Sequence, residues 1–238
     1  SLHDALPIWN RPGLVRHQRC VIIFASSSRF PRPSTVNNFL MPVLPAEASV
    51  FWFRWNTENL MVTTHVFIAT SLDGYIARHN DDIDWLLQRD DPNEDHGYTA
   101  FIADKDWIVM GRGSYEKVRT FETWPYDRPV LVLSRQLADT PVPDALRGKV
   151  QFSGRTPKEV LDDLAIQNAR RVYLDGGQVI QSFLREGLVA DMVITTVPVL
   201  LGSGKSLFGA LPGDIDLTLV SSRCFPSGLV QSHYRVTP

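Results

Sequence analysis

One glycine-rich segment has the composition of a phosphate-binding loop. Residues 197–209 read VPVLLGSGKSLFG, an apolar run followed by Gly-Ser-Gly-Lys-Ser. The phosphate-binding loop of nucleoside triphosphatases needs a glycine, four residues and then Gly-Lys-Ser/Thr, so that backbone N–H groups surround the phosphates. Here Val199 occupies the position of the first glycine, and the residues after Ser206 do not predict the helix that should follow. The spacing therefore argues against hydrolysis of a nucleoside triphosphate.

Three other segments place glycine, serine or arginine directly after an apolar run that is typical of a buried strand. Ligands of open parallel sheets bind beyond the C-terminal ends of the strands, so we expect these residues to meet at one edge of a sheet. The runs cover residues 107–110, 130–133 and 172–174, and they lead into Gly-Arg-Gly-Ser-Tyr-Glu, Ser-Arg and Asp-Gly-Gly-Gln-Val.

These residue types suit a ligand that carries phosphate groups. Gly176-Gly177 precedes a predicted helix, and it suits a pyrophosphate because glycine allows a close approach and a helix N-terminus offers free N–H groups. Ser114, predicted as the N-cap of a short helix, suits a second phosphate oxygen. Arg112 and Arg135 each follow a strand and suit a bidentate clamp on a ribose phosphate. Each feature has a plain alternative, a tight turn or a solvated side chain, and only their joint placement favours a site.

The elements that would position these residues alternate between strands and helices, which favours the α/β class with a mostly parallel sheet. One helix start carries three agreeing signals, with Thr156 as N-cap, Pro157 at the first helical position and Glu159 at the third. A Pro-Ser-Gly turn at residues 226–228 predicts an antiparallel hairpin near the C-terminus. We expect strands at residues 66–70, 107–110, 129–133, 171–174, 190–196, 217–221 and 229–236, and helices at residues 178–186 and from residue 157 onward.

The overall composition is that of an ordinary globular protein. The chain has 238 residues, 44% of them hydrophobic and 21% charged, with a formal net charge of −2, which suits one domain with or without an appendage. The near-neutral charge gives no reason to expect binding to nucleic acid or to a membrane surface. No apolar run approaches the roughly 18 residues of a membrane helix, and two cysteines fit a reducing compartment, so we expect a cytoplasmic protein. The six histidines show no ligand spacing, so no metal site is expected.

Residues 1–60 differ in character from the rest of the chain. They contain six prolines and three tryptophans among arginines and serines, with the period of neither a helix nor a strand. The first eight residues, SLHDALPI, resemble a translated sequencing-adaptor oligonucleotide, whereas Met61 opens a segment that suits the start of a cytosolic protein. We therefore predict that residues 1–60 are disordered or a non-native extension and that residues 61–238 form the domain. A genuine extension that binds a partner is the alternative.

Six segments within residues 62–238 occur in the order and spacing of a known superfamily. They read ATSLDGYIA, DIDWL, IVMGRGSYE, VLVLSR, VYLDGGQVIQSFL and VPVLLGSGKSLF. Together they resemble the dihydrofolate-reductase-like superfamily, and within it the reductase domain of the bifunctional riboflavin-biosynthesis deaminase/reductase and its stand-alone relatives. The resemblance implies a mostly parallel central sheet flanked by helices. The His-x-Glu and Pro-Cys-x-x-Cys motifs of the deaminase half are absent.

The resemblance also implies NADPH-dependent reduction of a pyrimidine, a pterin or a ribosylaminopyrimidine, and a homodimer. Dihydrofolate reduction and nucleotide binding without turnover are the alternatives. Carried over onto matching positions, the cofactor residues fall into four groups. Ala69 and Thr70 would adjoin the nicotinamide ring, Gly111, Arg112 and Ser114 would hold the adenosine phosphates, Ser134 and Arg135 would bind the 2′-phosphate that distinguishes NADPH from NADH, and Gly176, Gly177, Gln178 and Val179 would contact the pyrophosphate and the nicotinamide side.

The source of the proton that a reduction needs is open at this stage. A carboxyl group with a raised pKa is one option, and the candidate catalytic residues are Asp73, after the first strand, and Asp84, beside Trp85. Each has a structural alternative, because Asp73 suits an Asp-Gly turn and Asp84 suits a helix cap. The acidic residue on the first helix of dihydrofolate reductases has no convincing match, which argues against folate as the substrate. Lys205 suits either a substrate phosphate or a solvated surface.

Overall fold

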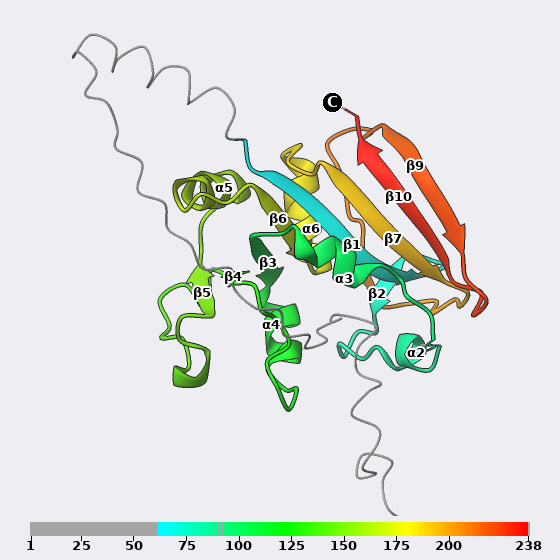
Figure 1. The fold of residues 1–238 in the computed structure, drawn as a ribbon, viewed down its shortest axis with the longest axis horizontal. Coiled ribbons are helices and arrows are strands. Elements are labelled where there is room, and N and C mark those ends of the chain that lie inside the picture. Colours follow the sequence, from blue (N-terminus) through cyan, green and yellow to red (C-terminus); the bar gives the residue numbers. More distant parts are fainter. Residues whose placement is uncertain (1–60, 90, 92, 238) are drawn as a thin grey trace, which may run out of the picture.

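A computed structural model describes residues 61–89, 91 and 93–237 (Figure 1). The prediction for residues 1–60 lies outside the described residues. An eight-stranded sheet with the order β5-β4-β3-β6-β1-β7-β10-β9 forms the centre of the fold. Its strands are β1 (Thr63–Ser71), β3 (Trp107–Gly111), β4 (Val130–Leu133), β5 (Val150–Ser153), β6 (Arg171–Asp175), β7 (Asp191–Val197), β9 (Leu217–Cys224) and β10 (Val230–Val236).

The sheet is mostly parallel, as the sequence predicted. The six neighbouring strands from β5 to β7 run parallel, and β10 and β9 add an antiparallel pair beside β7. Figure 1 shows β1 in the middle, with β9 and β10 at one end and β5 at the other. These observations confirm the α/β class and the C-terminal hairpin. Strand β5 was not predicted, because its sequence, Val-Gln-Phe-Ser, lacks the continuous apolar run that marks the equally short β4.

The two helices whose starts were predicted at residues 157 and 178 begin at or within one residue of these positions, as α5 (Pro157–Ile166) and α6 (Gly177–Arg185). At α5 the Thr156 side chain accepts a hydrogen bond from the Glu159 N–H, and the Glu159 carboxylate accepts one from the Thr156 N–H at 2.9 Å, which confirms the capping box. Over the described ranges, no helix has the length and apolar character that crossing a membrane requires. The helices are α2 (Asp84–Leu87), α3 (Tyr98–Ala103), α4 (Arg112–Val118), α5 (Pro157–Ile166) and α6 (Gly177–Arg185), with a 3-10 turn η3 (Asp144–Leu146).

Apolar side chains fill both faces of the parallel strands. On one face, residues such as Val109 and Leu174 pack with the apolar sides of α5 and α6. On the other face, Ile108 and Tyr173, their neighbours along the strands, pack with α3 and α4. A strand that is covered on both faces needs apolar residues at successive positions. This is why these strands read as continuous apolar runs in the sequence.

The C-terminal hairpin is covered far less. Every residue of β9 is exposed, including Leu217, Leu219 and Val220. In the sheet β9 pairs with β10 along one side, and it forms the edge of the sheet on the other. The exposed strand β9 therefore contributes little to the core, whereas Phe225 and Leu229 at the hairpin turn are buried and pack with Val197 at the end of β7.

A second, small sheet lies beside the C-terminal end of β1. It consists of β2 (Tyr75–Ala77) and β8 (Lys205–Ser206), which are antiparallel. Gly204 precedes β8 and approaches β2 so closely that a Cβ at this position would collide with the Ala77 carbonyl oxygen. Lys205 and Ser206 thus form a strand and not the start of a helix, which agrees with the argument against a triphosphate-binding loop.

Candidate functional site

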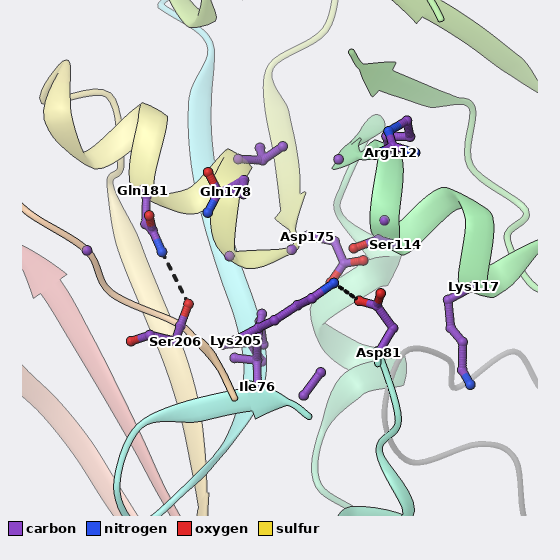
Figure 2. Close-up of a pocket in the computed structure, with 18 of the residues that line it drawn as sticks. Ile76, Asp81, Arg112, Ser114, Lys117, Asp175, Gln178, Gln181, Lys205 and Ser206 are labelled. Carbon is purple, nitrogen blue, oxygen red and sulfur yellow. Dashed lines mark hydrogen bonds and ion pairs between the residues drawn. The ribbon is translucent and has the colours of Figure 1, made fainter. Parts of the chain in front are cut away.

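A pocket of about 810 Å³ opens at the C-terminal ends of the parallel strands (Figure 2). Its lining comes from the ends of β1, β3, β4 and β6, from the first turns of α4 and α6, and from the small sheet of β2 and β8. This size is within the range of ordinary small-molecule sites. The pocket brings together eight of the predicted cofactor residues, namely Ala69, Gly111, Arg112, Ser114, Gly176, Gly177, Gln178 and Val179.

The turn between β6 and α6 leaves backbone N–H groups available to an anion. Gly176 has a φ of +88°, and a Cβ there would lie 2.6 Å from Oγ of Ser114, so this position accepts only glycine. Helix α6 begins at Gly177 with nine residues, and within the described residues no side chain caps its N-terminus. The uncapped N–H groups and the helix dipole favour a phosphate group at this point.

The first turn of α4 lies beside that glycine turn. The helix begins at Arg112 with Gly111 as N-cap, so Ser114 lies inside the first turn and is not the N-cap that the sequence predicted. Arg112 pairs with Glu116 at 2.9 Å, and both side chains are nearly half exposed. An exposed pair at this spacing contributes only about 0.3–0.5 kcal/mol, so the guanidinium of Arg112 is available to an anionic ligand.

Asp175, the last residue of β6, contributes a buried carboxyl group to the pocket lining. It is 5% exposed, and its Oδ1 lies 3.4 Å from the Tyr173 hydroxyl, which also donates to the Phe67 carbonyl oxygen at 3.0 Å. Its Oδ2 has no hydrogen-bond partner in the part of the chain that the structure describes. Burial raises the pKa of Asp175 to about 6, although the Ser114 hydroxyl, the Tyr173 hydroxyl and the Gly176 N–H oppose the shift. A carboxyl group with this pKa can hold a proton and donate it to a ligand.

Asp73, the first predicted catalytic residue, is not part of the pocket lining. Its carboxylate accepts hydrogen bonds from the Ser71 hydroxyl at 2.6 Å and from the N–H groups of Leu201 and Gly202 at 3.1 and 2.7 Å. These bonds, that of Ser71 first, lower the pKa of Asp73. Asp73 thus ties the turn after β1 to the loop before β8, and its catalytic role stays a prediction.

Asp84, the second predicted catalytic residue, also lies outside the lining. It pairs with Arg78 at 2.7 Å, and this hydrogen bond lowers its pKa. Its side chain does not cap α2, because the Asp82 carboxylate accepts the N–H groups of Ile83 and Asp84 at 2.7 and 3.1 Å. An ionised, paired aspartate is a poor proton donor, so the structure favours Asp84 no more than Asp73.

Three predicted cofactor residues adjoin the lining without being part of it. Leu133, at the end of β4, lines the pocket, and Ser134 and Arg135 follow it directly. The side chain of Arg135 is exposed. Thr70 is buried next to Ala69, which lines the pocket. The contacts predicted for these three residues stay predictions.

An ion pair crosses the mouth of the pocket. Lys205 extends from β8 and donates a hydrogen bond to Asp81, in the loop after β2 (Figure 2). Both side chains line the pocket and are a little under half exposed. Sequence reasoning did not single out Asp81, because no local signal marks this loop. No role was predicted for Asp175 from its motif, Asp-Gly-Gly-Gln-Val, although a carboxylate at a strand end directly before Gly176-Gly177 is a usable signal.

Two sequence comparisons place the chain among known proteins. The family model described as the RibD C-terminal domain matches residues 63–231. The uncharacterized protein YwjB of Bacillus subtilis (strain 168) is 31% identical over 175 residues, which span 72% of this chain and 96% of YwjB.

Solved structures have the same fold. A protein of Shewanella sp. PV-4 that has been assigned to riboflavin biosynthesis is 38% identical, with a TM-score of 0.70 over 74% of this chain and 100% of that chain. The dihydrofolate reductase of Enterococcus faecalis, in complex with NADP(H), is 14% identical, with a TM-score of 0.53 over 74% of this chain and 97% of that chain. At 14% identity, the likeness to this dihydrofolate reductase concerns the fold alone. The dihydrofolate-reductase-like fold that the motifs predicted is confirmed.

Proposed function

The chain belongs to the RibD C-terminal domain family, and from this premise we propose that it is an NADPH-dependent reductase of a pyrimidine, a pterin or a ribosylaminopyrimidine. One observation carries the proposal. An uncapped helix N-terminus and a buried carboxyl group with a raised pKa line the same pocket. The first suits the diphosphate of a dinucleotide, and the second suits the proton that a reduction consumes.

The residues around α4 and α6 fit the cofactor. The Gly176 turn leaves no room for a side chain, so a diphosphate could approach the backbone N–H groups that begin α6. Arg112 and Ser114 would contact the same phosphates from α4, and Arg135, beyond β4, would bind the 2′-phosphate. When bound, NADPH supplies a hydride to an electrophilic carbon of the substrate. Ala69, at the end of β1, would adjoin the nicotinamide ring.

Asp175 is the group that we propose as the proton donor. Its Oδ2 is buried and lacks a partner among the described residues, and the residue lines the pocket. In the proposed reaction this carboxyl group holds the proton that a substrate atom takes up as it gains electron density. The Tyr173 hydroxyl, which donates to the Phe67 carbonyl oxygen at 3.0 Å, lies 3.4 Å from the other carboxyl oxygen and restricts the orientation of the group. The raised pKa keeps a useful fraction of the carboxyl protonated near neutral pH. Neither Asp73 nor Asp84 has this combination of burial and raised pKa.

The test follows NADPH oxidation at 340 nm with ribosylaminopyrimidine, pteridine and dihydrofolate substrates in turn. We expect turnover with at least one of them, and a loss of kcat of about 100-fold in Asp175→Asn, the lower end of what general acid catalysis contributes. Asp162→Asn, an exposed carboxyl group on α5, is the matched control and should keep full activity.

The same experiment separates the alternatives. Oxidation of NADPH with dihydrofolate alone, together with tight binding of methotrexate, would make the protein a dihydrofolate reductase. NADPH binding without oxidation across the whole panel would make it a nucleotide-binding module. Full activity of Asp175→Asn in the presence of turnover would leave the reductase in place and remove the role of Asp175.

A further inference from the structure

The ion pair of Lys205 and Asp81 joins two sides of the pocket that no other described ion pair connects. Lys205 comes from β8, and Asp81 comes from the loop that leads from β2 to α2. Figure 2 shows the extended lysine side chain reaching to the aspartate, and Ser114 and Asp175 line the same pocket. The pair therefore lies in the space that an anionic ligand of this pocket would share.

The backbone of Lys205 is held next to the N-terminus of α6. Gln181 of α6 donates its side-chain amide to the carbonyl oxygens of Ser206 and Leu207, both at 3.2 Å. The Ser206 carbonyl oxygen lies so close to Gly177 that a Cβ on that glycine would be 2.9 Å away. Lys205 thus stands one residue from a contact with the first residue of α6. Its long, flexible side chain can turn from Asp81 toward the uncapped N–H groups.

Asp81 is held on the opposite side, against α4. Its φ of +66° is a left-handed conformation that residues other than glycine rarely adopt. Backbone hydrogen bonds from Asp81 to Arg78 and from Arg78 to Asp82, at 3.1 and 2.9 Å, close the turn around it. One oxygen of its carboxylate lies 3.9 Å from the place of a Cβ on Gly113, in the first turn of α4. A negative group thus already stands where the proposed function puts phosphate oxygens.

We propose that Lys205 is a further residue of the diphosphate site and that Asp81 is its internal counter-ion, which the diphosphate of a dinucleotide displaces. The inference rests on the proposed function and deepens it. In the structure Lys205 is paired with Asp81. A diphosphate carries more negative charge than one carboxylate and also interacts with the N-terminus of α6, so it can take over the lysine. Since exposed ion pairs are weak, Asp81 lowers the affinity moderately without blocking the site.

Three variants test the competition, because it makes their effects depend on each other. In Lys205→Met the diphosphate loses a charge-assisted contact, and we expect about tenfold weaker binding. In Asp81→Asn the lysine is free, and we expect binding about three- to fivefold tighter. Asparagine tolerates the left-handed backbone, so this variant keeps the turn. In the double variant the gain from Asp81→Asn should shrink, because no lysine remains for which the two anions compete.

Two probes are titrated against each variant. Binding of NADPH is followed by its fluorescence, and binding of inorganic pyrophosphate is followed by calorimetry. Lys158→Met and Asp162→Asn are the matched controls, because they break an exposed Lys–Asp pair on α5, away from the pocket; they should leave both affinities unchanged. Melting temperatures confirm that each variant is folded.

The outcomes separate the inference from the proposed function. Unchanged affinities in Lys205→Met would overturn the inference, and so would an equal gain from Asp81→Asn with and without the lysine. Wild-type protein that binds neither probe would overturn it as well. Binding of pyrophosphate with the expected pattern but no binding of NADPH would support the diphosphate site and contradict the proposed cofactor. Normal binding of NADPH with no dependence on Lys205 would support the proposed cofactor and contradict the role of Lys205 in the diphosphate site.

Discussion

The pocket has two walls that are built on different principles. One wall consists of the strand ends and of the turns that lead into α4 and α6. These elements are packed in the apolar clusters on the two faces of the sheet. Its critical positions, Gly176 and Asp175, are fixed by close packing and burial. The other wall is the small sheet of β2 and β8 with the adjoining loops. Its backbone is held by Gln181 of α6 and by the burial of Leu207, but its charged side chains, Lys205 and Asp81, are nearly half exposed.

The difference teaches where the chemistry can lie. A buried wall can hold a carboxyl group away from water and so change its pKa, whereas an exposed wall leaves its charges screened and ready to exchange partners. We therefore assign proton transfer to the packed wall and exchange of counter-ions to the exposed one. Substitutions in the packed wall should have large effects that salt does not relieve. Substitutions in the exposed wall should have smaller effects that salt reduces.

The largest effect is expected for Gly176→Ala. Alanine would have to adopt a backbone conformation reserved for glycine, at a cost of roughly 1–3 kcal/mol, and its Cβ would overlap Oγ of Ser114. We expect the affinity for NADPH to fall by at least about 100-fold, measured by fluorescence titration. Gly148→Ala is the control, since Gly148 also has a positive φ, +77°, but a Cβ there would meet no atom within 4 Å. Gly148→Ala should lose stability and keep its affinity for NADPH. An equal loss of affinity in both variants would contradict the proposed close approach of the diphosphate to the Gly176 turn.

The next effect concerns Asp175→Asn and the dependence of stability on pH. Because burial raises the pKa of Asp175 from 3.8 to about 6, the folded protein binds this proton more tightly than the unfolded chain does. The free energy of unfolding should therefore fall as the pH rises from about 4 through 6, by roughly 2–3 kcal/mol. Asparagine removes this contribution. The free energy of unfolding of the variant, measured by urea denaturation, should therefore rise relative to that of the wild type between pH 4 and pH 8. A constant difference between the two proteins would show that Asp175 is not held protonated.

Activity should follow the same carboxyl group. For the wild type, kcat should decline as the pH rises above the pKa of Asp175, because only the protonated form donates. The residual activity of Asp175→Asn should lack this limb. If kcat of the wild type instead rose with pH through pH 6, Asp175 would act as a general base.

A smaller effect is expected for Arg135→Ala, which tests the choice of cofactor. If the exposed guanidinium beyond β4 binds the 2′-phosphate, its loss should cost about 1–3 kcal/mol for NADPH, the range of a charge-assisted contact, and little for NADH. Arg147→Ala, in which another exposed arginine is removed, should change neither. Equal losses for the two cofactors in Arg135→Ala would remove the assigned role.

The smallest effect is expected for Asp84→Asn, which breaks the partly exposed pair with Arg78. Such pairs contribute roughly 0–1 kcal/mol, so stability should change little, and kcat should stay within about twofold of the wild type with the same pH profile. Loss of the pH-dependent limb in this variant would restore Asp84 as the acid that the sequence suggested and would weaken the case for Asp175.

The sequence predicted the scaffold better than the site. The runs of β3, β4 and β6 and the capping box at Thr156 depend on residues that are neighbours in the chain, and the structure confirms them. The site residues depend on what lies opposite. Asp73 binds the N–H group of Gly202, 129 residues further along the chain, which the sequence could not place beside it. Asp84 pairs with Arg78, only six residues earlier, but no local pattern shows that this pair lies outside the pocket lining. The expected homodimer and cytoplasmic location stay predictions.

The sequence by itself determined seven of the eight strands of the main sheet, the glycine turns and the family, because periodicity and the conformational freedom of glycine are local properties that a linear pattern displays. Only the tertiary structure decided that Asp175 is the buried carboxyl group and that Lys205 meets Asp81 across the pocket. Burial and ion pairing depend on distances between segments more than a hundred residues apart, such as β8 and the loop after β2. Those distances arise from the packing of the whole sheet, and no window of the sequence contains them.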